Sequence, residues 1–284
     1  MPLTSIARVI RETFRSTRQR IGGGGNGEVY RRRTPLGRQT VIKEPHAYDG
    51  PNGRLGIETE SVTLQDLSRP GHPGIEEYRG HGKYYSYLEV EFIEGETLME
   101  YFTRLSPAAR LAQALPIFRE VVSAVAYIHD REYVHTDLNW KNVLKTKAGI
   151  KIIDFAFSRP EGIWLEAETD EPGKIKIAGT RSYLNPARIR DGRPPLREDD
   201  IFALGLMLFE LLSGQKAINI DLGLPYDEQI KGLHLGLRRR ILALDVPEPV
   251  IDLIFRMLGL FGDVQYRNCY EILAALDEIE GGQA

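Results

Sequence analysis

The chain has 284 residues, with 37 Lys and Arg against 40 Asp and Glu, and 42% of its residues are apolar. This length and composition suit a large folded region with a substantial core and exclude wholesale disorder. The near-balanced charge argues against nucleic acid as a partner, and the single cysteine excludes an internal disulfide and a multi-cysteine zinc site.

We expect no secretory leader and no apolar segment that is long enough to span a bilayer. Arginines interrupt the early apolar residues, and the longest nearly apolar run, residues 201–209, is nine residues long. We therefore expect a soluble, cytoplasmic protein without a transmembrane segment. Residues 1–17 are basic and amphipathic, and we expect a helix there that packs on the following domain or contacts a partner or an anionic membrane surface.

Residues 18–93 have the composition of a small, β-rich lobe. β-Branched and aromatic residues typical of strands gather at 28–30, 40–43 and 85–92. One helix interrupts these strands, and its apolar face contains Ile57, Leu64 and Leu67.

Residues 94–284 have mainly helical patterns. Ser106 is a capping hydroxyl followed by a proline, which predicts the start of a long helix that runs toward His129. Two short strands are expected near 143–144 and 150–153. Further helices are expected at 199–213, 248–260 and 268–280. The sequence therefore predicts an α+β, bilobal protein with a β-rich smaller lobe and a mainly helical larger lobe.

A glycine-rich segment contains G-x-G-x-x-G-x-V at Gly22, Gly24, Gly27 and Val29. Glycines let backbone N–H groups approach a phosphate chain without Cβ clashes. The pattern alone fits a flexible linker, a dinucleotide-binding turn or a hairpin over a nucleoside triphosphate. Strand-like residues follow it, whereas the dinucleotide turn needs a helix there, and the missing G-K-[ST] excludes a P-loop.

A lysine and a glutamate accompany the glycines. Lys43 ends a strand-like segment, where its side chain would lie beneath a glycine hairpin. Glu60 lies on the predicted helix, and packing of the apolar face of that helix would aim Glu60 at Lys43, with Glu58 as a rival. A carboxylate partner would hold the ammonium charged and oriented. Together with the glycines, this pair favours a phosphate clamp.

The chain also contains H-x-D-L-x-x-x-N from His135 to Asn142, and Asp154 ends an apolar strand further along. Mg²⁺ takes hard oxygen ligands, which Asn142 and Asp154 supply, so Asp137 is left to accept a hydroxyl proton. We interpret His135 as a histidine that organises the loop. Lys141 either neutralises charge on a transferring phosphoryl group or is a solvated loop lysine.

With these motifs in this order, the chain resembles the eukaryotic-type protein kinases over roughly residues 18–280. The motifs that carry the resemblance are the glycine loop, the end of V-A-I-K at Lys43, the helix glutamate Glu60, the catalytic loop 135–142 and a D-F-G-like triplet that begins at Asp154.

Four more segments are similar to that family. Glu91, Phe92 and Ile93 resemble the hinge between the lobes, whose backbone would pair with adenine. Residues 179–186 are similar to G-T-x-x-Y-x-A-P and residues 200–205 to D-x-W-S-L-G. Arg267 stands where the family keeps an arginine near the last helix.

The resemblance implies a serine/threonine protein kinase that transfers the γ-phosphoryl group of ATP to a protein or peptide substrate, itself included, with Mg²⁺ or Mn²⁺. We expect Lys43, Asp137, Asn142 and Asp154 to meet around one triphosphate. The implied roles are nucleotide binding for Gly22, Gly24, Gly27, Val29, Lys43, Glu91 and Ile93, metal binding for Asn142 and Asp154, and catalysis for Asp137, Lys43, Lys141 and Glu60.

The chain departs from the family pattern at several positions. In the catalytic loop, Asn139 stands where serine/threonine kinases have a lysine and Lys141 where tyrosine kinases have an arginine, so the loop alone leaves a serine/threonine or a tyrosine substrate open.

Thr136 replaces the arginine that pairs with a phosphorylated activation segment, so we expect activity that does not depend on phosphorylation there. Ala156 replaces the D-F-G glycine; we expect the metal-binding conformer to remain accessible, with a damaged site as the alternative. Ala187 replaces the glutamate of A-P-E, so Arg267 should find another carboxylate or be exposed. Thr180 favours a serine/threonine substrate.

Two other functional classes remain open. A pseudokinase scaffold that binds nucleotide is suggested by the departures at Thr136, Ala156 and Ala187. A small-molecule phosphotransferase of the aminoglycoside-kinase type would share the H-x-D-x-x-x-x-N loop, although residues 179–186 and 200–205 favour a peptide substrate. The acidic run at 166–171 is interpreted as a solvated loop, a phosphate mimic or a feature that favours basic peptides.

Overall fold

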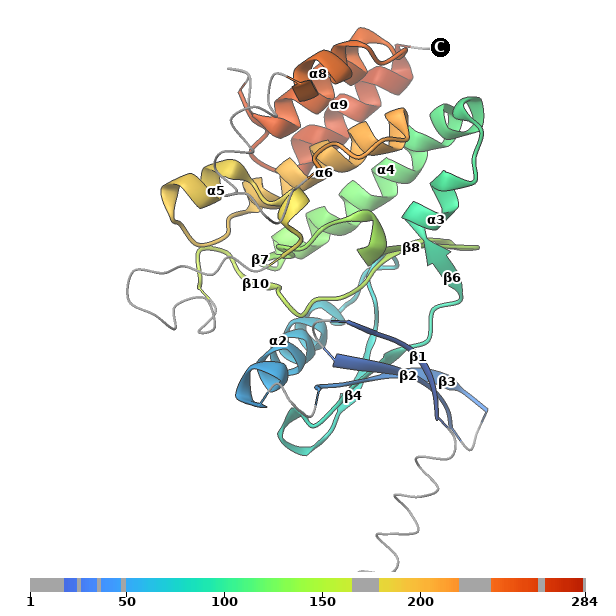
Figure 1. Ribbon diagram of the computed structural model, residues 1–284, viewed down its shortest axis with the longest axis vertical. Coiled ribbons are helices and arrows are strands. Elements are labelled where there is room, and N and C mark those ends of the chain that lie inside the picture. Colours follow the sequence, from blue (N-terminus) through green and yellow to red (C-terminus); the bar gives the residue numbers. More distant parts are fainter. Residues whose placement is uncertain are drawn as a thin grey trace, which may run out of the picture. The chain divides into compact units, whose positions relative to one another are not determined.

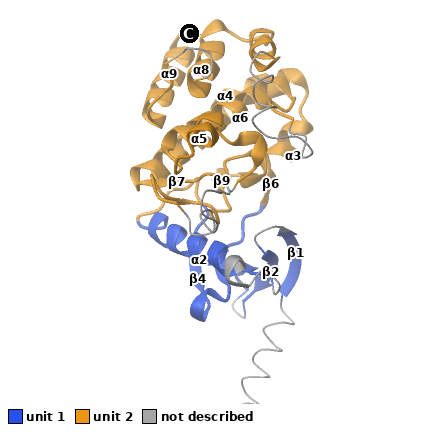
Figure 2. Cartoon of the chain, turned by 60° about the vertical axis from the view of Figure 1, so that its left-hand side comes forward, with its two compact units in different colours: residues 1–69, 76–94 blue, residues 70–75, 95–284 orange. Residues whose placement is uncertain are grey.

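The computed structural model describes residues 18–24, 27–34, 37–46, 50–164, 179–219, 236–259 and 264–282. The helix expected over 1–17 and the acidic run at 166–171 lie outside these residues. The chain divides into two compact units, which Figure 2 shows in different colours: unit 1 has residues 1–69 and 76–94, and unit 2 has residues 70–75 and 95–284. The division therefore follows Glu94, and a short segment from within the first part of the chain belongs to unit 2.

Unit 1 is built on a five-stranded antiparallel sheet with strand order β1-β2-β3-β5-β4 (Figure 1). Its elements are β1 (Arg18–Gly24), β2 (Gly27–Arg33), β3 (Gln39–Glu44), helix α2 (Gly50–Leu67), β4 (Tyr78–His81), the 3₁₀ turn η1 (Lys83–Tyr85) and β5 (Leu88–Glu91). The apolar face predicted for α2 is confirmed, because Ile57, Leu64 and Leu67 are buried and α2 packs on β4 and β5.

The strand expected over 85–92 is shorter than predicted. Tyr84 and Tyr85 have φ angles of 56° and 52°, inside the left-handed region that aromatic residues rarely adopt. These conformations close a turn before the strand, so β5 covers only Leu88–Glu91. Aromatic content alone could not distinguish that turn from a strand.

Unit 2 contains two small sheets and most of the helices. The sheets have the orders β6-β8-β9 and β10-β7, with β6 (Gly95–Thr97), β7 (Tyr133–Val134), β8 (Val143–Thr146), β9 (Gly149–Ile152) and β10 (Arg159–Pro160). The α-helices are α3 (Leu98–Thr103), α4 (Pro107–Asp130), α5 (Pro186–Asp191), α6 (Arg197–Ser213), α8 (Glu248–Leu258) and α9 (Cys269–Gly281), and the 3₁₀ turns include η2 (Trp140–Asn142) and η4 (Arg181–Tyr183). Residues 236–242 are also helical.

The core of unit 2 forms around helices α4 and α6. Helix α4 begins as predicted: the Ser106 hydroxyl accepts the Ala109 N–H at 3.3 Å, and Pro107 occupies the first turn. It continues without interruption through Pro116. By length and hydropathy α4 could cross a bilayer, but half of that stretch is buried within the structure, and α4 packs against α6 and α9. The predicted α+β class, with a β-rich smaller part and a mainly helical larger part, is confirmed.

Residues 70–75 are fastened to unit 2 by backbone and side-chain hydrogen bonds. The Ile152 N–H donates to the Gly74 carbonyl at 2.8 Å, and Lys151 Nζ donates to the Ile75 carbonyl at 3.0 Å. The Gly71 N–H donates to the Tyr127 hydroxyl at 3.1 Å. This segment therefore lies against strand β9 of unit 2, although it stands in the sequence between two elements of unit 1.

Candidate active site

The glycine-rich segment forms an antiparallel strand pair. Gly24 lies opposite Gly27, and Gly22 lies opposite Val29. Gly27 has a φ of 138°, and a Cβ at this position would stand 2.1 Å from the Glu44 carbonyl oxygen, so only glycine fits. Because strand β2 follows the glycines, the linker and dinucleotide-turn interpretations are wrong.

Lys43 lies next to the glycine-bearing strands. Val29 on β2 is paired with Lys43 on β3, and directly opposite residues of an antiparallel pair project from the same face of the sheet. Lys43 Nζ is 2.6 Å from Glu60 Oε1, as predicted, whereas the rival Glu58 is exposed. The unit therefore presents a lysine held by a buried carboxylate on the same face as Val29.

Sequence reasoning missed a second carboxylate at this lysine. Glu76 Oε2 is 3.0 Å from Lys43 Nζ, and the carboxylates of both Glu60 and Glu76 are buried. Glu76 lies just before β4, outside any periodic apolar pattern, so only the pairing of distant strands places it here. The ammonium is thus shared between two acids.

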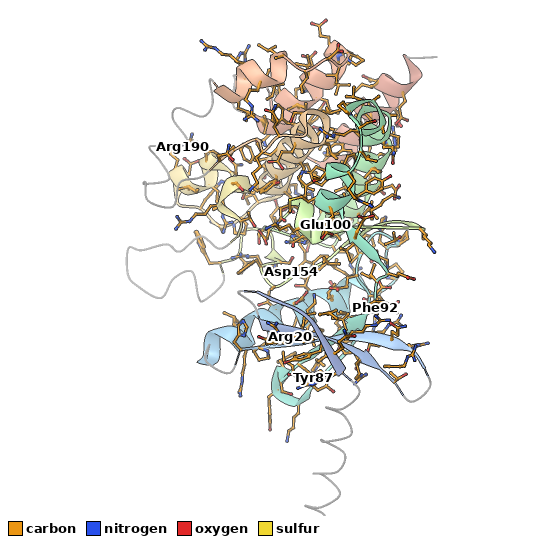
Figure 3. All side chains as sticks on the ribbon, turned by 45° about the vertical axis from the view of Figure 1, so that its right-hand side comes forward. Arg20, Tyr87, Phe92, Glu100, Asp154 and Arg190 are labelled. Carbon is orange, nitrogen blue, oxygen red and sulfur yellow. The ribbon has the colours of Figure 1, made fainter. Side chains whose placement is uncertain are left out.

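The predicted nucleotide-binding backbone lies at the end of strand β5. The Glu91 N–H donates to the Glu77 carbonyl at 3.0 Å, and the Glu91 carboxylate accepts the Glu77 N–H at 2.9 Å. Phe92, labelled in Figure 3, has the Arg31 guanidinium 4.4 Å from its ring centroid. Ile93 follows, and its N–H donates to no described residue.

In unit 2, Asp137 has its carboxylate fixed from both sides. Asp137 Oδ1 accepts the Thr180 N–H at 2.7 Å, and Asp137 Oδ2 accepts the Asn142 side-chain amide at 3.0 Å. The same Asn142 nitrogen also donates to the Asp137 carbonyl at 2.9 Å. This carboxylate therefore has one orientation, set by residues from two separate segments of the chain.

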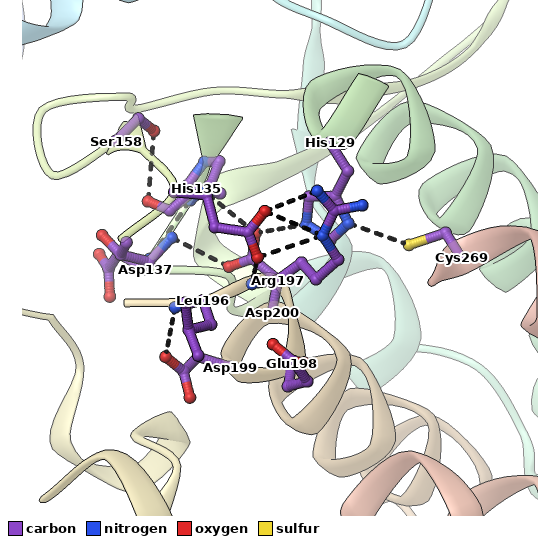
Figure 4. A network of polar contacts seen from close by, with 12 residues as sticks. His129, His135, Asp137, Ser158, Leu196, Arg197, Glu198, Asp199, Asp200 and Cys269 are labelled. Carbon is purple, nitrogen blue, oxygen red and sulfur yellow. Dashed lines mark hydrogen bonds and ion pairs between the residues drawn. The ribbon is translucent and has the colours of Figure 1, made fainter. Parts of the chain in front are cut away.

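The loop that carries Asp137 is anchored on the buried Asp200 of helix α6 (Figure 4). The N–H groups of His135 and Thr136 donate to Asp200 at 2.8 and 2.9 Å. Thr136 has a φ of 66°, a strained conformation for a β-branched residue, which these hydrogen bonds hold in place. His135 is fully buried, and its ring centroid lies 4.8 Å from that of Phe155, which agrees with its interpretation as a loop-organising residue.

The two predicted metal ligands are neighbours in unit 2. The Ile153 N–H donates to the Asn142 carbonyl at 2.9 Å, so Asp154 (Figure 3) directly follows this contact. The Asn142 side-chain nitrogen donates hydrogen bonds to Asp137, so the Asn142 side-chain oxygen is left to bind a metal ion. The Asp154 carboxylate makes no hydrogen bond or ion pair with any described residue. Two hard oxygen donors of this kind fit Mg²⁺.

Within the described ranges, no group of three or more His, Cys, Asp or Glu side chains could hold a metal ion. A metal at Asn142 and Asp154 would therefore take its remaining ligands from water and phosphate oxygens.

The D-F-G-like triplet consists of Asp154, Phe155 and Ala156. Asp154 has a φ of 66°, whereas Ala156 is not among the described residues that have a positive φ. Alanine thus adopts this conformation without the strain that a left-handed backbone would impose.

The structure therefore brings Asp137, Asn142 and Asp154 together within unit 2, while Lys43 and Glu60 form a second cluster within unit 1. Lys141 is exposed and lies outside the Asp137 hydrogen bonds. Arg267 is exposed, in agreement with the expectation that it would not be a buried, unpaired guanidinium.

Comparisons with known proteins identify the family. The family described as "Protein kinase domain" matches residues 15–258. The chain is 29% identical over 218 residues to the "Probable serine/threonine-protein kinase PknB" of Lactococcus lactis subsp. lactis (strain IL1403), covering 75% of this chain and 33% of that protein. It is 32% identical over 198 residues to the "Serine/threonine-protein kinase PrkC" of Bacillus subtilis (strain 168), covering 69% of this chain and 30% of that protein.

A third relative, the "Serine/threonine-protein kinase pkn2" of Myxococcus xanthus, is 27% identical over 273 residues, which cover 90% of this chain and 31% of that protein. The chain thus spans about a third of the length of these relatives. The family match extends over most of the chain and includes both the Lys43 cluster and the Asp137 cluster. The chain belongs to the protein kinase family.

Proposed function

We propose that this chain is an ATP-dependent protein kinase domain that transfers the γ-phosphoryl group to Ser or Thr hydroxyls of protein substrates. The observation that carries the proposal is the Asp137 carboxylate, whose two oxygens are fixed by donors at 2.7 and 3.0 Å. The relatives named as serine/threonine kinases support the same substrate class.

Asp137 would orient the acceptor hydroxyl and take its proton as the hydroxyl oxygen attacks phosphorus. Thr180 and Asn142 hold the carboxylate in place, so little reorientation is needed when the acceptor binds. Because the Thr180 N–H comes from the segment that resembles G-T-x-x-Y, the acceptor-binding segment and the base are aligned by one hydrogen bond.

Lys43 would bind phosphate oxygens of the nucleotide, together with backbone N–H groups of the glycine hairpin. Glu60 and Glu76 fix its position. Mg²⁺ held by Asn142 and Asp154 would neutralise phosphate charge. The backbone at Glu91 and Ile93 would bind the adenine ring.

A transfer assay with labelled ATP and Mg²⁺ or Mn²⁺, on a mixture of proteins, tests this function. We expect Asp137→Ala to lower turnover by roughly 10²–10⁴, the usual scale for a general base. Asp154→Ala should also lose activity. As a control, Asp191→Ala removes an exposed ion pair with Arg190 and should keep the transfer activity.

Full activity of Asp137→Ala would remove this residue from the mechanism. ATP binding by the wild type without transfer to any protein would assign the chain to the scaffold class. Transfer to a sugar or an antibiotic, with none to protein, would assign it to the small-molecule phosphotransferases.

A further inference from the structure

Unit 2 contains a pocket of about 420 Å³ directly beside the proposed base. Asn139 and Thr180 line it, and both contact Asp137: the Asn139 side-chain amide donates to the Asp137 carbonyl at 2.9 Å, and the Thr180 N–H donates to its carboxylate. Apolar side chains also line this pocket, among them Leu98, Phe102, Trp140 and Leu211. A peptide bound here would lie close to the acceptor hydroxyl that Asp137 is proposed to orient.

Three cationic side chains line the same pocket, namely Arg110, Lys141 and Lys216. Lys141 and Lys216 are exposed, and none of the three forms an ion pair with a described residue. The Arg110 Nε is buried without a hydrogen-bond acceptor, and Arg110 Nη2 has only a long contact of 3.5 Å to the Leu105 carbonyl. These groups are therefore free to bind an anionic ligand.

Glu210 is the one acid among the described residues that line the pocket, and it is already engaged. It accepts hydrogen bonds from the Tyr183 hydroxyl and, at 2.8 Å, from the Ala217 N–H. Burial raises the pKa of the Glu210 carboxyl, against the opposing effects of these hydrogen bonds and of the Lys216 ammonium. Glu210 is thus a poor partner for a basic substrate side chain. The lining carries three formal positive charges against one negative.

We propose that this pocket binds an acidic segment of the protein acceptor, so that the domain selects Ser or Thr residues flanked by Asp or Glu. The proposal rests on the proposed kinase function and names its substrate class. It is opposite to the preference for basic peptides that the acidic run at 166–171 suggested. Charge complementarity supports it: a basic peptide would be repelled by the three cations of the lining, whereas an acidic one would pair with them.

Three peptides of equal length, each with a single central Thr flanked by Glu, Gln or Lys, test the preference. We expect kcat/KM to be highest for the Glu peptide and lowest for the Lys peptide. Lys216→Glu should lower the Glu-to-Lys ratio by about tenfold, because it removes one exposed attraction and adds one repulsion. Lys147→Glu, an exposed lysine that does not line the pocket, is the control and should leave the ratio unchanged.

A binding measurement separates this proposal from the kinase function. The chain has two tryptophans, so Trp164→Phe leaves Trp140 of the pocket as the only one. The Glu peptide should change Trp140 fluorescence saturably without ATP, with an affinity that falls as salt is added, and the Lys peptide should not.

Binding of the Glu peptide with no transfer to any peptide or to any protein of the mixture would uphold the pocket assignment and reject the kinase function. Equal kcat/KM values for the three peptides, or a preference for Lys, would overturn the pocket assignment while the function stands. The absence of both binding and transfer would overturn both.

Discussion

Lys43 is bonded to two buried carboxylates that come from different parts of unit 1, Glu60 on α2 and Glu76 just before β4. Loss of either acid leaves Lys43 Nζ in contact with the other carboxylate, whereas loss of both removes both of these contacts. Glu76 would therefore keep Lys43 oriented when the contact from α2 is missing.

We expect Glu60→Gln alone to lower kcat/KM for ATP by less than about tenfold, because Glu76 still holds the ammonium. The Glu60→Gln/Glu76→Gln double variant should lose roughly hundredfold or more, well beyond the product of the single losses. Steady-state kinetics of the four proteins measures this coupling. Glu58→Gln, an exposed neighbour on the same helix, is the control. Equal losses in the single and double variants would contradict a role for Glu76.

For single residues, the sequence predicted the contact between Lys43 and Glu60 but not the backbone conformations. Helical spacing located Glu60, because its position relative to Leu64 and Leu67 is a local property. Glu76 could not be found, since its contact depends on which strands pair. The positive φ angles of Thr136 and Asp154 were equally hidden, because these residue types rarely adopt them and the hydrogen bonds of the fold impose them.

Among the elements, the pairing of β1, β2 and β3 depends on Gly27. We expect Gly27→Ala to lower the free energy of unfolding by about 2 kcal/mol or more, because its Cβ would meet the Glu44 carbonyl at 2.1 Å and φ is 138°. Gly80→Ala, in β4, meets no atom within 4 Å and should change stability by less than about 0.5 kcal/mol. Denaturant unfolding measures both, and equal stabilities of the two variants would refute the close approach at Gly27.

Helices α4, α6 and α9 are joined by one buried polar cluster (Figure 4). His129 of α4 lies with Nε2 3.0 Å from Asp200 Oδ2 of α6 and with Nδ1 3.6 Å from Cys269 Sγ of α9. Burial opposes protonation of His129, but the Cys269 sulfur and the Asp200 carboxylate outweigh it and raise the pKa of His129 to about 10. The folded protein therefore retains a proton that the unfolded chain releases near pH 6.5.

The folded state binds more protons than the unfolded state between about pH 6.5 and 10. We therefore expect the free energy of unfolding to fall as pH rises through this window. The contribution of His129 is fully present below about pH 6.5 and is lost progressively toward pH 10. Denaturant unfolding at several pH values across this range measures the prediction. The free energy of unfolding should fall less steeply with pH in His129→Gln than in the wild type. His81→Gln, at an exposed position, serves as the control. An identical slope in His129→Gln would contradict the prediction.

At the scale of the whole molecule, composition and motif order predicted the fold class and family, because periodic patterns and ordered motifs are properties of long segments. The pocket lined by Arg110, Lys141 and Lys216 could not be predicted in this way. Its three cations come from α4, η2 and the segment after α6, and only tertiary packing brings them together. The assignment of residues 70–75 to unit 2 was hidden for the same reason.

We expect the whole domain to be active without phosphorylation of its activation segment. The Thr136 hydroxyl donates to the Phe157 carbonyl at 2.7 Å and offers no positive charge to a phosphorylated segment. We expect phosphatase-treated protein, verified by mass spectrometry, to keep its initial rate of transfer to an added substrate. A loss of activity that returns on rephosphorylation would show that other residues bind such a phosphate.

The placement of residues 70–75 has a practical consequence for dissecting the protein. The backbone passes from one unit to the other after Arg69, after Ile75 and again after Glu94. A fragment truncated at Glu94 would carry Gly74 and Ile75 away from Ile152 and Lys151, to which they are bonded. The remaining C-terminal fragment would display an unsatisfied strand edge. Neither half can be excised with a single cut, so attempts to express them separately should graft this hexapeptide back onto the C-terminal piece.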